Sequence, residues 1–174
     1  MNTFSRAALL LGLLTLGCKK DASETAATAG DGTITWTQNG QSYTSTLYSS
    51  AIVDTGDKII ITGSPADLNT VVSLALPGIN AKGAGTYDLP RRAGSTEVAV
   101  GGLTLDAKAP STARPYETLF GPAASNGTIT VTQYDKASQK LSGTFSFTAG
   151  AMPSTSATGT QAVTNGSFSF TRFR

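Results

Sequence analysis

The chain has 174 residues, with 13 lysines and arginines, 11 aspartates and glutamates and no histidine, which gives a formal net charge of +2. Charged residues make up only 14% of the sequence, which excludes the strongly basic surface that nucleic-acid-binding proteins need. The absence of histidine removes the usual general base and zinc ligand, and with them Ser-His-Asp and Cys-His catalysis.

The first 17 residues are typical of an export signal. Residues 1–6 are polar with one positive charge at Arg6, and residues 7–16 are almost wholly apolar. About ten apolar residues are too few for a transmembrane helix, which needs about 20, but they suit the apolar region of a signal peptide. An ordinary cleaved signal is the alternative, but Gly17 and Cys18 end the segment as a bacterial lipoprotein site does, and Cys18 is the only cysteine. We therefore expect cleavage after Gly17 and acylation of the Cys18 sulfur.

Cleavage would leave 157 residues and remove Arg6, so that 12 basic residues face 11 acidic ones. This length suits one domain with its own core. Residues 19–30 (KKDASETAATAG) are polar, small and aperiodic, as in a flexible tether, and reach at most about 40 Å. We predict three parts, a leader (1–17), a lipidated cysteine with its tether (18–30) and a single domain (31–174). The acyl chains would hold this domain at the outer membrane, in the periplasmic or the surface leaflet.

From residue 31 onward the hydrophobic pattern has a period of two, which indicates β-strands. Residues 33–37 place Ile34 and Trp36 on one face and threonines on the other, so we expect Trp36 in the core. Asn39-Gly40 is a strong hairpin signal because both residues tolerate a positive φ. At Gly101-Gly102 the apolar positions change parity, which predicts a β-bulge. The predicted strands of the first half are residues 33–37, 43–53, 58–62, 71–76, 86–89 and 97–105.

The second half alternates with more regularity. We predict a strand over residues 128–132, a turn at residues 135–138 and a returning strand over residues 141–147. A last strand is predicted within residues 161–173. No window shows an amphipathic helix after the leader. We predict an all-β fold, an antiparallel β-sandwich or open barrel of about ten short strands with no helix in the mature domain. The pattern leaves sandwich and barrel open.

Three phrases in this half also carry a resemblance: GTITVTQYD from Gly127, LSGTFSFTA from Leu141 and VTNGSF from Val163. Together they resemble an uncharacterised family of small Bacteroidota lipoproteins with a lipid cysteine, a short tether and one all-β domain. Trp36 followed by the Asn39-Gly40 turn fits the same family. The resemblance implies a location and a fold, and it implies no activity or catalytic residue.

Carboxylates are the candidates for catalysis, because two of them suffice for glycoside hydrolysis. Asp88, Glu97, Glu117 and Asp135 each lie at a strand edge or a turn, where a solvated carboxylate is expected. Asp54-Thr-Gly-Asp57 could hold calcium, but this pattern is more typical of turn chemistry. We therefore predict that the protein is not an enzyme and has no metal site and no cofactor.

Tyrosines are the candidates for ligand binding. Tyr43, Tyr48 and Tyr116 could stack on sugar rings if they formed an exposed row. The sequence thus predicts a monomeric, lipid-anchored, non-catalytic binding or accessory module, partnered by an outer-membrane protein complex or a glycan. A surface carbohydrate-binding protein that uses these tyrosines is the alternative, and a carboxylate-dependent hydrolase is a third hypothesis.

Overall fold

The structure is a computed structural model that describes residues 30–92 and 97–174. The predicted leader, Cys18 and the tether up to residue 29 lie outside the described residues, so lipidation stays a prediction. Within the described ranges, no helix is both long enough and apolar enough to cross a membrane.

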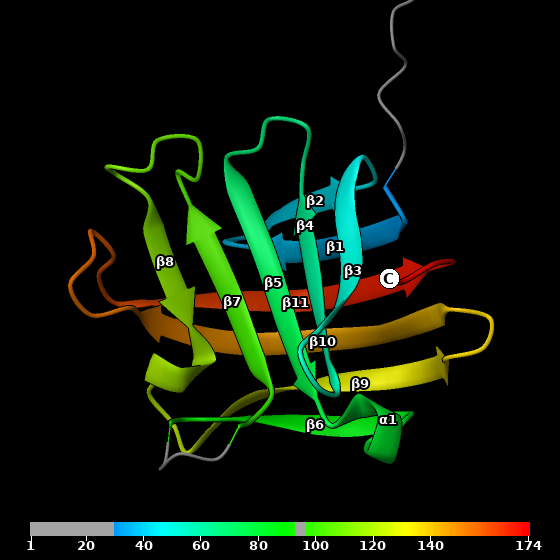
Figure 1. Ribbon diagram of the computed structural model, residues 1–174. Coiled ribbons are helices and arrows are strands. Elements are labelled where there is room, and N and C mark those ends of the chain that lie inside the picture. The colour runs from blue at the N-terminus through cyan, green and yellow to red at the C-terminus, as the bar shows by residue number, and fades with distance from the viewer. Residues whose placement is uncertain (1–29, 93–96) are drawn as a thin grey trace, which may run out of the picture.

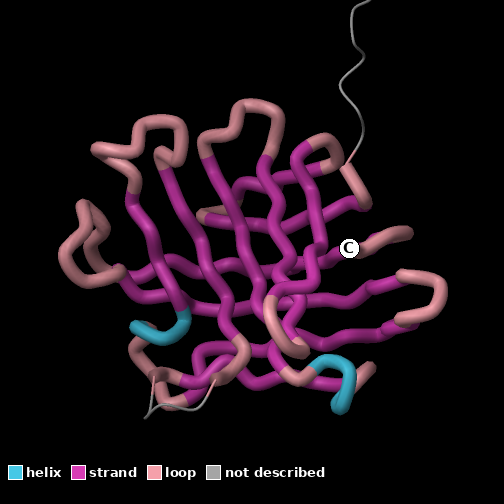
Figure 2. Tube along the Cα trace, in the orientation of Figure 1, coloured by secondary structure: helices cyan, strands magenta, loops and turns pink. Residues whose placement is uncertain are grey.

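Eleven strands form one antiparallel sheet that is nearly closed into a barrel (Figures 1 and 2). The all-β prediction with about ten strands is confirmed, and a single curved sheet decides between sandwich and barrel. The strands are β1 (Gly32–Gln38), β2 (Gln41–Ser45), β3 (Tyr48–Asp54), β4 (Lys58–Ser64), β5 (Thr70–Pro77), β6 (Gly85–Pro90), β7 (Val100–Leu105), β8 (Arg114–Glu117), β9 (Ser125–Asp135), β10 (Lys140–Ala151) and β11 (Thr160–Phe170).

The sheet folds over itself to give two layers. The first layer has the order β6-β9-β10-β11-β1-β2, and the second has β8-β7-β5-β4-β3. In Figure 1, β9, β10 and β11 run across the view, while β5, β7 and β8 run from top to bottom. The layers join where Gly150 and Ala151, at the end of β10, pair with Glu117 and Tyr116 of β8.

Both ends of the described chain cover the open edge of β3. The Asp31 amide donates to the Ser49 carbonyl (3.2 Å), and the Arg174 amide donates to the Ala51 carbonyl (3.1 Å). The Arg174 guanidinium also bonds the Asp31 carboxylate at 2.7 Å. An uncovered strand edge is a template for unwanted pairing, so this seam protects β3 and nearly closes the barrel.

The core lies between the two layers, as the alternation predicts. Trp36 is 1% exposed and stacks on Tyr43, its partner across β1 and β2, with ring centroids 5.3 Å apart. The Asn39-Gly40 turn between these strands is confirmed by φ angles of 51° and 77°. The last two strands of the first layer add four phenylalanines to the core: Phe145, Phe147, Phe168 and Phe170.

Two short helical elements differ from the prediction. A short α-helix, α1 (Ile79–Lys82), and a 3-10 turn, η1 (Thr118–Phe120), interrupt the β-structure, so the prediction of no helix is wrong. Each is a single turn that buries one residue, Ile79 or Thr118, and is too short to produce a helical period in the sequence.

The predicted bulge at Gly101-Gly102 is also wrong, because β7 pairs with β5 in unbroken register. Gly101 points inward, where a Cβ would lie 2.8 Å from the Phe147 ring. The ring of Phe147 therefore fills the core position that a side chain at Gly101 would otherwise take.

Replacing Gly150 with alanine should lower the free energy of unfolding by about 2–3 kcal/mol, because overpacking forces the backbone to move. A Cβ there would lie 1.9 Å from the Phe120 carbonyl oxygen, which is backbone and cannot rotate away. Gly102→Ala is the control, since its Cβ would meet the Ser73 hydroxyl at 2.5 Å, and that side chain can turn. Urea unfolding of the two variants checks this; equal stabilities would contradict the tight junction between β10 and η1.

Candidate functional site

Serine and threonine side chains cover the outer surface of the first layer. We call this surface the hydroxyl face. One row crosses all six strands in register, through Thr86, Thr130, Thr144, Ser167, Thr35 and Thr44. Neighbouring hydroxyls bond one another in part, as between Thr35 and Ser167 at 2.8 Å. Further outward hydroxyls on this face are Thr33, Thr37, Ser42, Thr128, Thr132, Ser142, Ser146, Thr148, Thr164 and Ser169.

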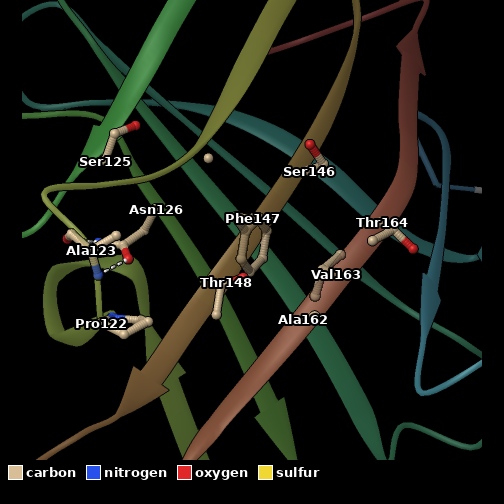
Figure 3. Close-up of a pocket in the computed structure, with 11 residues that line it drawn as sticks. Pro122, Ala123, Ser125, Asn126, Ser146, Phe147, Thr148, Ala162, Val163 and Thr164 are labelled. Carbon is tan, nitrogen blue, oxygen red and sulfur yellow. Dashed lines mark hydrogen bonds between the residues drawn. The ribbon is translucent and has the colours of Figure 1, made fainter.

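The face is hollowed where β9 begins beside β10 and β11. This first hollow has a volume of about 330 Å³ and is open to solvent. Figure 3 shows Ser146, Phe147 and Thr148 on β10 beside Val163 and Thr164 on β11, with Pro122 and Ala123 at the other side. The lining residues are Pro122, Ala123, Ser125, Asn126, Gly127, Ser146, Phe147, Thr148, Ala162, Val163 and Thr164.

A second hollow of about 410 Å³ adjoins the first, because both are lined by Ser146. Its other lining residues are Thr128, Thr144, Phe145, Asn165, Gly166 and Ser167. We call the two hollows together the hydroxyl trough. Among the described residues that line the two hollows, no side chain is charged or titratable, and the Asp88 carboxylate bonds Ser125 at the rim. The lining itself therefore offers donors and acceptors of hydrogen bonds.

Asn126 shapes one wall of the trough. It is 5% exposed, and its Nδ2 donates to the carbonyls of Thr118 (3.0 Å) and Ala123 (2.9 Å). Its Oδ1 accepts from the Ala123 amide at 3.0 Å, the bond drawn in Figure 3. These bonds satisfy the buried amide and fix the loop before β9. In the sequence, Asn126 could be read only as part of a turn.

Gly127 lets β9 approach β10 at the same point. Its φ is 135°, and a Cβ would lie 2.2 Å from the Ser146 carbonyl oxygen. A side chain at this position would therefore separate the strands and fill the hollow.

Several trough hydroxyls have no hydrogen-bond partner in the part of the chain that the structure describes. Among residues 30–92 and 97–174, the side chains of Ser146, Thr148 and Thr164 make no hydrogen bond. Ser125, at the rim, donates to the Asp88 carboxylate. The free hydroxyls surround an apolar floor whose exposed residues are Pro122, Ala123 and Ala162, which is the mixture of groups that small-ligand sites use.

The three predicted tyrosines do not form an exposed row. Tyr116 is 2% exposed and donates its hydroxyl to the Thr158 carbonyl, so its prediction as a ligand platform is wrong. The inward parity of β8 buries its ring in the core. Tyr43 is half-buried and stacks on the more deeply buried Trp36. Only Tyr48, at 46% exposure, presents its side chain to solvent, and it lies on the second layer, away from the trough.

The four candidate carboxylates are spread over several elements. Asp135 accepts hydrogen bonds from the amides of its own turn, Ala137 and Ser138. Asp88 and Glu97 both line an open hollow of about 290 Å³ beside Lys82. Both are exposed and already bonded, Asp88 to Ser125 and Glu97 to Lys58 at 3.0 Å.

Glu117 differs from these three because it is half-buried on β8, between Gly102 of β7 and Gly150 of β10. Burial raises the pKa of its carboxyl above the ordinary 4.5, and the charge of Arg92 offsets part of this rise. The folded protein therefore holds this proton more tightly than the unfolded chain does. The resulting stability is present at acidic pH and is lost as the pH rises through the folded-state pKa.

As the pH rises from about 4 to about 7, the free energy of unfolding of the Glu117→Gln variant should therefore fall less than that of the wild type, since glutamine does not ionise. Urea unfolding of both proteins across this range measures the difference. Parallel stability profiles would contradict a buried carboxyl at this position.

Asp54 and Asp57, the other acidic pair of the sequence, serve the turn that follows β3. Asp54 pairs with Lys58 at 2.8 Å, and this hydrogen bond lowers the pKa of its carboxyl. Asp57 accepts from the Asn80 amide at 2.7 Å. Among the described residues, no cluster of acidic or cysteine side chains could hold a metal ion.

A family model described as a domain of unknown function, DUF6252, matches residues 30–171. The chain belongs to the DUF6252 family. Its matched span covers every strand and the whole hydroxyl face. Neither the curated proteins nor the solved structures contain a match to this DUF6252 chain. The resemblance to an uncharacterised all-β family is thus confirmed as membership of a family of unknown function, while lipidation and a Bacteroidota origin stay predictions.

Proposed function

We propose that this protein is a lipid-anchored, non-catalytic binding module whose hydroxyl trough takes a neutral, polyhydroxylated ligand such as a glycan. The observation that carries the proposal is the trough itself, which combines free hydroxyls with an apolar floor and no titratable group. A neutral polyol offers donors, acceptors and apolar C–H faces to such a surface. The anchor rests on the leader sequence and on Cys18.

The absence of charge in the trough narrows the ligand class. An anionic polymer would need lysines or arginines to pair with, and the trough has none. General acid–base chemistry would need a titratable side chain beside the bound ligand, and the Asp88 carboxylate at the rim already accepts a hydrogen bond from Ser125. Binding without turnover is the function that this set of groups supports.

Filling the trough should abolish ligand retention. Ser146 lines both hollows and is exposed, so Ser146→Trp should block both without unfolding the protein. In affinity electrophoresis against a panel of neutral polysaccharides, we expect this variant to bind at least about tenfold more weakly than the wild type, since a blocked site loses most of its contacts.

Ser169→Trp is the matched control, because Ser169 is exposed on the same face but lines neither hollow. It should migrate like the wild type. The proposal fails if the wild type is retarded by no polysaccharide of the panel, or if the two tryptophan variants lose retention equally.

A further inference from the structure

Exposed apolar side chains gather on and beside β3. Among the described residues, five large hydrophobic side chains are exposed, and four of them lie between residues 47 and 53. We call Leu47 (38% exposed), Tyr48 (46%) and Ile52 (49%) the β3 patch, whereas Val53 (45%) lies on the other side of β3, the side of its buried partner Ile59. Such a cluster on a surface marks an interaction site more often than single exposed residues do.

The patch continues across the outer surface of the second layer. Ile52 pairs with Ile60, Ile60 with Ala75, and Ala75 with Val100. These four apolar residues form one row over four strands, where the first layer carries its row of hydroxyls. The neighbouring row on this surface is hydroxylated, through Ser50, Thr62 and Ser73, so the apolar residues form a stripe beside it.

The tether joins the domain beside this patch. The Gly30 amide donates to the Thr46 carbonyl at 2.7 Å, and the Asp31 amide donates to Ser49. Figure 1 shows the described chain beginning next to the start of β3. Residues 19–30 span at most about 40 Å even when fully extended, so a lipid on Cys18 keeps the patch close to the bilayer.

We propose that the β3 patch docks on the lipid surface, an inference that rests on the proposed acylation of Cys18. Apolar side chains at a membrane surface enter the headgroup region by about 5–10 Å, and Tyr48 suits this region because its ring is apolar and its hydroxyl polar. The exposed Arg172 lies beside the seam and favours anionic headgroups, whereas the charge of Arg174 is paired with Asp31.

The seam also favours a lipid surface, and not an added protein strand, as the partner that covers the β3 patch. The backbone edge of β3 is occupied by Asp31 and Arg174, so a partner cannot add a strand there. Only the side chains of the patch remain to be covered. Docking through the second layer turns the hydroxyl trough, on the first layer, away from the membrane and toward its ligand.

Single-cysteine labelling tests the orientation in the intact lipidated protein. Acylation consumes the only native cysteine, so Ile52→Cys carries a unique thiol for a fluorophore. Thr144→Cys, exposed in the hydroxyl row, is the matched control. The labelled proteins are reconstituted in vesicles of zwitterionic and anionic phospholipids that contain a lipid with a quencher near its headgroup.

We expect quenching at position 52 to exceed that at position 144 by about threefold or more, as for an interfacial side chain. Equal quenching of both labels in vesicle-bound protein would overturn the docking and leave the anchor standing. Protein that does not float with the vesicles and keeps a free thiol at Cys18 would instead overturn the anchor. Protection of position 52 from an aqueous quencher without lipid quenching would mean that a protein, such as a second copy, covers the patch, and would also overturn the proposal.

Discussion

Replacing Cys18 with alanine should abolish labelling by an alkyne-tagged palmitate, and behind a leader that ordinary signal peptidase cleaves, the same substitution should also release the protein from membranes. Two or three acyl chains, at about 0.8 kcal/mol for each buried methylene, give an anchor that does not dissociate readily. The described residues contain no helix that could replace it. Metabolic labelling followed by membrane flotation measures both effects, and mass spectrometry of the wild type should find its mature amino terminus at Cys18.

An uncleaved leader could itself retain the variant in the membrane, so the control carries Cys18→Ala behind a leader for ordinary signal peptidase. This protein should be soluble after flotation in high salt. The β3 patch alone should bind vesicles only at high lipid concentration and should dissociate on dilution, because a small interfacial surface is a weak anchor. A wild-type protein without palmitate would contradict the anchor.

Replacing Trp36 with alanine should lower the free energy of unfolding by about 4 kcal/mol, as for large aromatic residues removed from a core. The indole is 1% exposed and stacks on Tyr43, so its loss leaves a cavity and an unstacked ring. For a chain of this size, the midpoint of thermal unfolding should fall by about 10 °C. Calorimetry or urea unfolding measures the change.

Trp36→Phe separates packing from hydrogen bonding at the same position. The indole Nε1 is buried and is the one buried side-chain nitrogen or oxygen without a partner in the described part of the chain. Phenylalanine keeps most of the packing and removes an N–H whose burial costs about 1–3 kcal/mol. We expect this variant to lose less than about 2 kcal/mol. A loss equal to that of Trp36→Ala would mean that the indole N–H is satisfied.

For the hydroxyl face, the sequence predicts which side chains of each strand point outward, but it does not predict which strands lie side by side. Alternation alone places the threonines of residues 33–37 and 128–132 on the solvent side of their strands, because successive side chains point to opposite faces. It does not say which strands are neighbours. Thr35, Thr144 and Thr86 share a row only because β1 pairs with β11, β10 with both β11 and β9, and β9 with β6.

The sequence by itself determined the local structure: the all-β class, the Asn39-Gly40 turn and the inward face of Trp36. Each depends on backbone preferences or on period-two alternation within a few residues. The tertiary structure decided what depends on contacts between distant segments. Pairing of β8 with β10 joins the two layers into a nearly closed barrel. The Phe147 ring fills the space that a side chain at Gly101 would need, and the ring of Tyr116 is buried in the core. The register of strands far apart in the chain aligned the hydroxyl row of the first layer and the apolar row of the second, because long-range pairing, which no short window records, fixes which residues are neighbours.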